Sequence, residues 1–123
     1  MRFISTQVHG VIDYVVGVVL IAAPWILGFA DGGMAQWVPV ILGAATIIYS
    51  LLTDYELGLA HVIPMPVHLW LDGISGLFLA ASPWLFGFAD EVWMPHLIVG
   101  VLEIIVTLTT EPHPSIRQTH ITT

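Results

Sequence analysis

Long apolar stretches, interrupted by short polar segments, are the dominant pattern along this chain. Charged residues are absent from Tyr14 to Ala30, from Gly32 to Thr53 and from Gly73 to Ala89. A helix that crosses a bilayer core of about 30 Å needs roughly 20 apolar residues, and these runs are close to that length. The pattern therefore predicts four transmembrane helices, at about Val8 to Leu27, Trp37 to Thr53, Val67 to Phe86 and Trp93 to Thr110.

The segments between these helices differ in length. The first and third helices are each followed by a short acidic turn, "GFADGGMAQW" and "GFADEVW". The central connection, "DYELGLAHVIPMPV", is longer and contains prolines, which resist helix continuation. Pro24 and Pro83 each remove one helix hydrogen bond, so we expect kinks or early helix ends there. Trp25 and Trp84 are then expected at the membrane interface.

The two halves of the chain repeat each other. Residues 7–31 and 66–90 align without gaps and are identical at almost half of their positions, and further on Thr53 aligns with Thr110. Because each half holds two spans, both halves have the same orientation, and we expect a pseudo-two-fold axis along the membrane normal. The predicted organisation is a first two-helix repeat over 1–60, a second over 61–111 and a polar C-terminal tail over 112–123.

Composition supports a membrane protein and excludes several other classes. The chain is 57% hydrophobic and 9% charged, and its mean hydropathy is +0.91. Nine acidic residues stand against Arg2 and Arg117 alone, so nucleic acid is not an expected partner, because phosphate binding needs clustered cations. The lack of cysteine excludes thiolate catalysis and cysteine-ligated iron–sulfur clusters. We expect an all-α integral membrane protein with the lipid bilayer as its environment.

Topology follows from the two arginines. Both lie outside the predicted spans at the chain ends, and positive residues favour the cytoplasmic side. An even number of spans places both termini on one side. The pattern thus predicts cytoplasmic termini, with both short turns outside.

Two short motifs carry a resemblance to a known family. Ala23-Pro24-Trp25 and Ser82-Pro83-Trp84 are each followed by Gly-Phe-Ala-Asp. In this respect the chain resembles the SPW-repeat family of small bacterial membrane proteins, over about Ser5 to Glu111. The resemblance implies a four-span protein of the bacterial cytoplasmic (inner) membrane and implies no established activity. The first copy departs from the family pattern at Ala23, so the serine hydroxyl is not expected to have a shared role.

Each repeat also keeps a histidine, an aspartate and a glycine at positions i, i+4 and i+8, which lie on one helix face. The six residues are His9, Asp13 and Gly17 in the first copy and His68, Asp72 and Gly76 in the second. The parallel repeats place both His/Asp pairs at the same depth. We expect the pairs to meet where the first and third helices pack across the pseudo-axis.

Two interpretations of these pairs stay open. In a structural polar lock, His9, Asp13, His68 and Asp72 hydrogen-bond to each other and hold the two halves in register. Pairing across the axis is at least as favourable as pairing within a helix, because a histidine that precedes its aspartate has the poorer order for the helix dipole. In a metal site, the same four residues bind a divalent ion, either zinc, or iron or manganese with added water. Haem ligation by His9 and His68 is disfavoured by the neighbouring carboxylates.

Two further polar residues lie on the last predicted span. Glu103 is expected near mid-membrane, and its counterpart in the first repeat is Thr46. It is either part of a proton or cation relay, or a neutral acid that hydrogen-bonds within the bundle or to a partner subunit. His96, at the start of the span, is expected at the membrane interface.

Three function classes remain. The first is a structural or accessory helical module that self-associates or joins a larger membrane complex. The second is a metal- or cofactor-binding membrane protein that uses the paired His and Asp residues. The third is a small proton or ion transporter that also uses Glu103. We favour the first and lean against an enzyme, because nothing in the sequence forms a nucleophile, base and oxyanion arrangement.

Overall fold

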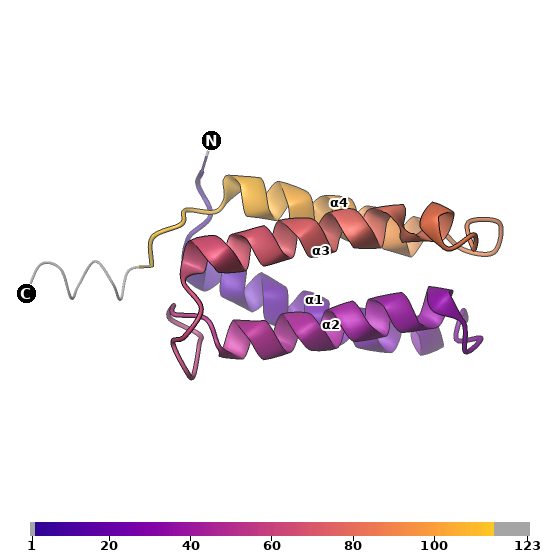
Figure 1. Cartoon of the computed structure of the whole chain (residues 1–123), viewed down its shortest axis with the longest axis horizontal. Helices are drawn as coiled ribbons and strands as arrows, with labels where there is room; N and C mark the ends of the chain where they lie inside the picture. Colours follow the sequence, from indigo (N-terminus) through magenta and orange to yellow (C-terminus); the bar gives the residue numbers. More distant parts are fainter. Residues whose placement is uncertain (1, 115–123) are drawn as a thin grey trace, which may run out of the picture.

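The computed structural model describes residues 2–114, which form four helices joined by short connections (Figure 1). The helices are α1 (Thr6–Ile26), α2 (Met34–Leu51), α3 (Met65–Leu85) and α4 (Met94–Thr109). Apart from isolated bridges, residues 2–114 contain no strand. The prediction of four helices is confirmed, with boundaries shifted by no more than a few residues. Most of the predicted polar tail, residues 115–123, lies outside the described part of the chain.

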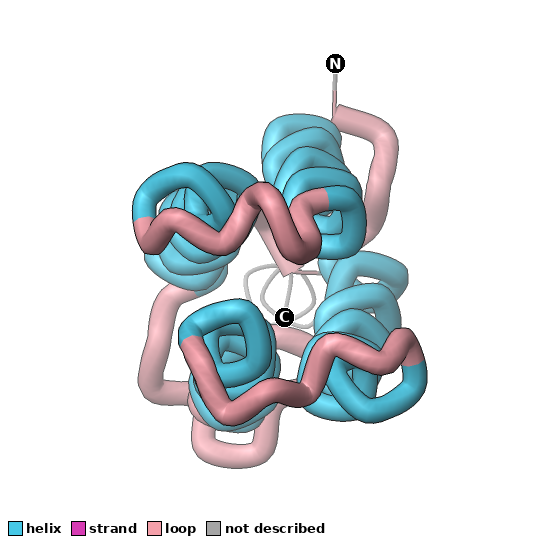
Figure 2. The backbone as a smooth tube through the Cα atoms, turned by 90° about the vertical axis from the view of Figure 1, so that its right-hand side faces the viewer, coloured by secondary structure: helices cyan, strands magenta, loops and turns pink. Residues whose placement is uncertain are grey.

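Seen end-on, the four helices stand at the corners of a square (Figure 2). α1 packs most extensively on α2 and α3 on α4, while α2 makes the main contact between the two pairs, with α3. α1 and α3 therefore lie on a diagonal of the square and are not packed neighbours. The prediction that these two helices pack directly on each other is wrong. Only side chains long enough to reach the centre of the bundle can join them.

Glycines bring the helices of each pair into backbone contact. A Cβ added at Gly43 would lie 2.6 Å from the carbonyl oxygen of Gly17. A Cβ added at Gly100 would lie 2.5 Å from the carbonyl oxygen of Gly76. Such distances leave no room for a side chain, as at other close helix interfaces. Gly17 and Gly76 thus serve the contact inside each pair and not the contact between α1 and α3.

The repeated Pro-Trp and Gly-Phe segments close α1 and α3 in the same way. Pro24 and Pro83 lie inside the last turn of their helices. Gly28 follows with a φ of 79° and Gly87 with a φ of 74°, the left-handed conformation that favours glycine. In both copies the amide of the next phenylalanine donates to the proline carbonyl at 2.8 Å. The early helix end expected after each proline is present.

Short backbone bridges join the two repeats at the opposite end of the bundle. Thr53, after α2, pairs with Ile63, before α3, and Thr110, after α4, pairs with Ile4, before α1. The residue after each threonine donates its amide to the carbonyl of the paired isoleucine, at 2.7 Å and 2.8 Å. The segment that leaves each repeat is thereby held on the segment that enters the other, which places both threonines at the same end of the bundle.

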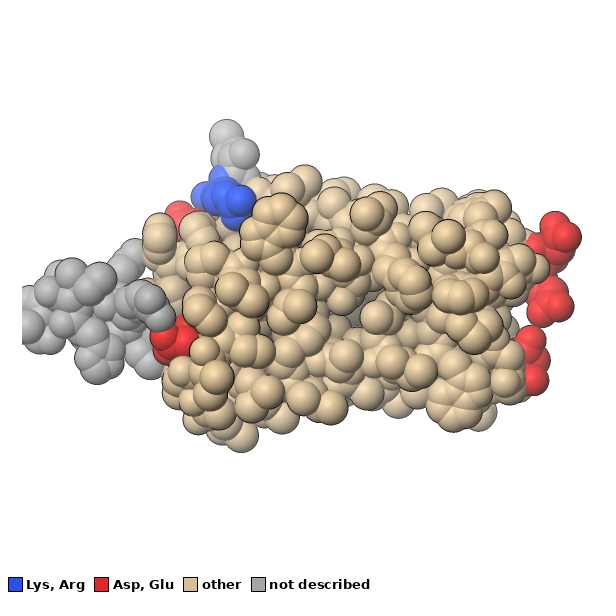
Figure 3. All heavy atoms as spheres, viewed as in Figure 1, with Lys and Arg blue, Asp and Glu red and all other residues tan. Residues whose placement is uncertain are grey.

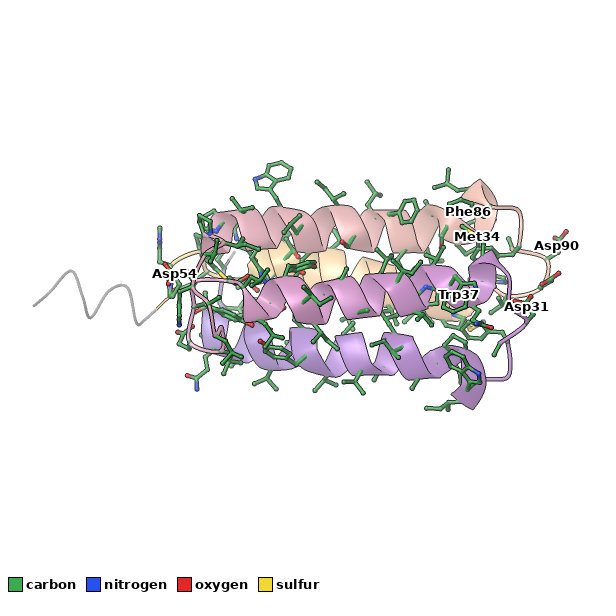
Figure 4. All side chains as sticks on the ribbon, turned by 60° about the horizontal axis from the view of Figure 1, so that its bottom comes forward. Asp31, Met34, Trp37, Asp54, Phe86 and Asp90 are labelled. Atoms are coloured by element: carbon green, nitrogen blue, oxygen red, sulfur yellow. The ribbon has the colours of Figure 1, made fainter. Side chains whose placement is uncertain are left out.

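The charged side chains in view in Figure 3 lie at the two ends of the molecule and leave an uncharged belt between them. Asp31 and Asp90 lie at one end and Asp54 at the other (Figure 4). Trp25 and Trp84 are 58% and 56% exposed. α1 and α2 are long and apolar enough to cross a membrane, whereas α4 is apolar but shorter. The exposed apolar belt fits a bilayer environment, and transmembrane positions for α3 and α4 stay a prediction.

Candidate functional site

Two polar pairs from α1 and α3 meet inside the bundle, near the end where both helices begin. The residues are His9, Asp13, His68 and Asp72, which we call the His–Asp cluster. Their side chains are 0% exposed, and one ligand atom of each lies within 4.8 Å of the others. Each helix carries its histidine and aspartate one turn apart on the face toward the centre, so the diagonal arrangement aims both pairs at the same point. The predicted convergence of the two pairs is confirmed.

The shortest contacts of the His–Asp cluster run between the repeats. His9 Nε2 lies 2.6 Å from Asp72 Oδ2, and His68 Nε2 lies 2.7 Å from Asp13 Oδ2. The contacts within one helix are longer. His9 Nε2 is 3.1 Å from Asp13 Oδ2, and His68 Nε2 is 3.3 Å from Asp72 Oδ2. The same two atom types, Nε2 and Oδ2, therefore face the centre in both repeats, and each nitrogen approaches two carboxylates.

A threonine holds the outer nitrogen of each histidine. His9 Nδ1 lies 2.7 Å from Thr110 Oγ1, and His68 Nδ1 lies 2.7 Å from Thr53 Oγ1. Each threonine hydroxyl donates, at 2.6 Å, to the carbonyl four residues earlier in the chain. Because the one hydroxyl proton is used there, the threonine oxygen accepts from the histidine, and Nδ1 carries the proton. Thr53 and Thr110 occupy equivalent positions in the two aligned repeats. Their contacts with the histidines depend on the backbone bridges, which no local sequence pattern reveals.

The outer carboxylate oxygens of the two aspartates have different surroundings. The Tyr49 hydroxyl donates to Asp72 Oδ1 and accepts from Thr46 Oγ1 at 3.4 Å. Among the described residues, no donor reaches Asp13 Oδ1 or Glu103 Oε1 while both carboxyl groups are ionised, and a protonated Glu103 carboxyl hydrogen-bonds to Asp13. Glu103 is 5% exposed, and Asp13 is among the groups that act on it electrostatically. The second repeat thus places a carboxyl group where the first repeat has the hydroxyl of Thr46.

A family model, the SPW repeat domain, matches residues 7–110. The chain belongs to the SPW repeat family. The matched region contains the whole His–Asp cluster and both threonines, and it confirms the resemblance that the Pro-Trp motifs indicated. Among curated proteins and among solved structures, no match to the chain was found.

The connection between the repeats covers the His–Asp cluster of this SPW repeat protein on one side. Tyr55 is 0% exposed, and its ring centroid lies 5.6 Å from that of His68. Burial raises the pKa of the Tyr55 phenol. A Cβ added at Gly10 would lie 2.6 Å from both Tyr55 and Leu57, so α1 has a glycine where the connection rests on it. The Tyr14 hydroxyl donates to the Leu57 carbonyl at 2.9 Å and holds the connection in place.

His96 lies apart from the cluster, in α4 near the acidic turns. It is 1% exposed, and its Nε2 donates to the carbonyl of Ala35 at 2.9 Å. The rings of Phe29 and Phe88 lie 5.2 Å and 4.9 Å from it, centroid to centroid. The SPW repeat protein therefore buries His96 between the two phenylalanines that follow α1 and α3, where the sequence indicated an interfacial residue.

The His–Asp cluster supports two chemical states, one that is neutral by itself and one that is neutral only with a bound divalent cation. With a proton on each Nε2, two imidazolium groups face two carboxylates through charge-assisted hydrogen bonds. Without those protons, two neutral imidazoles and two carboxylates direct lone pairs to a common centre, which suits a divalent cation. In both states the cluster joins the two repeats of the SPW repeat protein across the diagonal of the bundle.

Proposed function

We propose that this SPW repeat protein is a structural or accessory membrane module whose two repeats are fastened together by the His–Asp cluster. The observation that carries the proposal is that the shortest contacts, at 2.6 Å and 2.7 Å, join different repeats and are fully buried. Removing one partner from a buried charged pair costs about 3–5 kcal/mol, because the other charge is left uncompensated. Each repeat therefore supplies the carboxylate that pairs with the buried histidine of the other repeat.

The exposed surface supports a module that stays in the membrane. Large apolar side chains on the outer faces are more than half exposed, among them Val15, Ile41, Ile74 and Ile98. We propose four transmembrane helices with a pseudo-two-fold axis along the membrane normal, in the cytoplasmic membrane of a bacterium. Arg2 donates to the carbonyl of Thr110 at the end of α4, so this cation lies at the end that carries the cluster, which we assign to the cytoplasmic face. Self-association, or docking to a larger complex, would use the lipid-facing helix surfaces.

The test is the thermal unfolding of the Asp13→Asn/Asp72→Asn variant in mild detergent. We expect its melting temperature to fall by roughly 10 °C or more, because each amide replaces a buried carboxylate that faces both histidines. The chain offers a matched control in Asp31→Asn/Asp90→Asn, which changes the other repeated aspartates at exposed turns. A cluster variant that melts with this control would contradict the proposal.

A second candidate, a small proton or ion transporter, is favoured by one observation. Among residues 2–114, no donor reaches the buried carboxyl oxygens Asp13 Oδ1 and Glu103 Oε1 while both groups are ionised. Carboxyl groups of this kind inside a membrane protein often serve proton relays. The structural module is the better-supported proposal, because both histidines of the cluster pair with aspartates of the opposite repeat.

A further inference from the structure

We propose that the group joining the two repeats is a divalent transition-metal ion, with zinc the best match to the donors. Its ligands are Nε2 of His9 and His68 and Oδ2 of Asp13 and Asp72. This inference rests on the proposed fastening of the repeats and names what completes it. The ion takes the place of the two Nε2 protons that the metal-free cluster needs.

The first argument is the tautomer of the histidines. Thr53 and Thr110 each accept from a histidine Nδ1 at 2.7 Å, since their own protons are used on helix carbonyls. With the proton on Nδ1, Nε2 is the position that remains for a metal. Metal-ligating histidines in proteins generally donate their other ring N–H to an outer acceptor, which fixes the ring and raises its basicity. Both histidines of this chain have that outer acceptor, with the same geometry.

The second argument is the convergence of the donor atoms. Each Nε2 lies close to two carboxylate oxygens, His9 at 2.6 Å and 3.1 Å and His68 at 2.7 Å and 3.3 Å. One N–H points well at one acceptor only, whereas a central cation contacts all four atoms at once. Bonds of about 2.0–2.2 Å from zinc to nitrogen and oxygen place tetrahedral ligands roughly 3.3 Å apart. The four N···O distances are 2.6–3.3 Å and all four ligand atoms lie within 4.8 Å of one another, so small side-chain shifts, in which the closest N···O pairs separate, give this geometry.

The third argument is charge. Two carboxylates balance the charge of a divalent ion, so the filled site is neutral, as burial away from water requires. Asp72 is oriented from outside by the Tyr49 hydroxyl on its other oxygen. The side chain of Asp13 is fully buried as well. A cation bound to its carboxylate offsets the cost of burying that negative charge.

The donor set also selects the class of metal. Imidazole and carboxylate donors without thiolate suit zinc, iron and manganese. Four protein ligands in a site that is 0% exposed are the arrangement of a structural zinc site, which has no open position for a substrate. This closed arrangement agrees with an ion that joins two repeats.

The experiment is elemental analysis of the full-length protein in mild detergent, followed by chelator treatment and titration with Co²⁺. We expect about one zinc per chain and, with Co²⁺, the visible absorption of a four-coordinate ion. Both signals should be lost in Asp13→Asn/Asp72→Asn and kept in the Asp31→Asn/Asp90→Asn control. The double variant Thr53→Val/Thr110→Val should bind Co²⁺ about 10- to 100-fold more weakly and with an altered spectrum, because its histidines lose their outer acceptors. A spectrum unchanged by this variant would contradict the positioning role of the threonines.

Failure of the metal site and failure of the fastening give different results. A wild-type protein that contains no metal and takes up no Co²⁺ overturns the metal site. If the Asp13→Asn/Asp72→Asn variant of such a protein still melts lower than the control, the repeats are fastened by protonated histidines and the proposed function stands. If wild type binds metal but Asp13→Asn/Asp72→Asn melts at the same temperature as the Asp31→Asn/Asp90→Asn control, the proposed fastening is wrong and the metal site stands.

Discussion

At the residue scale, the polar residues of the core form two short chains from threonine through histidine to aspartate. Each begins at a threonine that follows α2 or α4, passes through the histidine of the other repeat and ends at the aspartate of the threonine's own repeat. Thr53 serves His68, which contacts Asp13, and Thr110 serves His9, which contacts Asp72. Because every member is held by the next, the orientation of each imidazole is determined by contacts at both of its nitrogens.

The two chains differ where they end, at the outer oxygen of the aspartate. Asp72 receives the hydroxyl of Tyr49, but Val106, the residue of α4 that aligns with Tyr49, has no polar group. Glu103, one turn earlier in α4, is close enough to Asp13 for an electrostatic interaction and a side-chain hydrogen bond. Substitution of Glu103 therefore tests whether the outer oxygen of Asp13 needs a polar partner from the second repeat.

We expect Glu103→Gln to keep a melting temperature close to that of wild type, because the amide has the same shape and can donate an N–H to Asp13. Glu103→Ala should lower the free energy of unfolding by about 1–3 kcal/mol, since it leaves the buried aspartate oxygen without a polar neighbour. Thermal unfolding of both variants in detergent measures this difference. Equal destabilisation by Gln and Ala would show that the acid itself is required.

The same pair of variants tests the transporter alternative. A transporter of this kind would carry protons across liposome membranes, and Glu103→Gln would abolish the flux while leaving the fold intact. Wild-type liposomes without proton flux would contradict that alternative.

At the element scale, glycines bring the helices of each pair into backbone contact. A Cβ added at Gly100 would lie 2.5 Å from the carbonyl oxygen of Gly76 and 2.7 Å from Ala80 Cβ. In the same pair of helices, a Cβ added at Gly73 would meet only Thr107 Cγ2, at an ordinary 3.6 Å. Atoms of α3 therefore occupy the space that a side chain at Gly100 would need, whereas a methyl group fits at Gly73.

We expect Gly100→Ala to destabilise the protein by about 1–3 kcal/mol, because the added methyl group forces α3 and α4 apart. Gly73→Ala is the matched control and should be neutral or stabilising by up to about 1 kcal/mol, since alanine favours the helix. Thermal unfolding of the two variants under the same conditions compares them directly. A Gly100→Ala variant as stable as Gly73→Ala would mean that α3 and α4 are not in backbone contact at this point.

At the scale of the whole molecule, the described chain has two chemically different ends. One end carries the acidic turns with Asp31 and Asp90, and the other carries Asp54, Arg2 and the His–Asp cluster. The apolar belt between them has no charged side chain in view (Figure 3). This distribution gives the molecule a defined orientation if the belt spans the membrane.

The proposed orientation can be measured with single cysteines, because the natural chain has none. In intact cells, a membrane-impermeant thiol reagent should label Asp90→Cys in the acidic turn but not Leu59→Cys in the central connection, where Leu59 is 78% exposed. Both variants should be labelled after the cells are opened, since both positions are at the surface. Labelling of Leu59→Cys alone in intact cells would reverse the orientation.

Local sequence determined the helices and the composition of the core. Apolar length, the Pro-Trp and Gly-Phe helix ends and the acidic turns depend on neighbouring residues, so four helices could be predicted within a few residues of their ends. Repetition of His9 and Asp13 as His68 and Asp72 also indicated that two polar pairs converge, because parallel repeats place equal positions at equal depth. Whether the cluster is a lock or a metal site did not follow from this pattern.

Only the tertiary structure decided how the repeats are joined. α1 and α3 are diagonal because Gly17 and Gly76 are used in contacts with α2 and α4. The glycines by themselves do not specify which helix packs on them. Thr110 reaches His9 because the residues after α4 bridge to Ile4 at the other end of the chain. Contacts between such distant residues depend on the packing of all four helices, whereas helix ends and turns depend on a few adjacent residues.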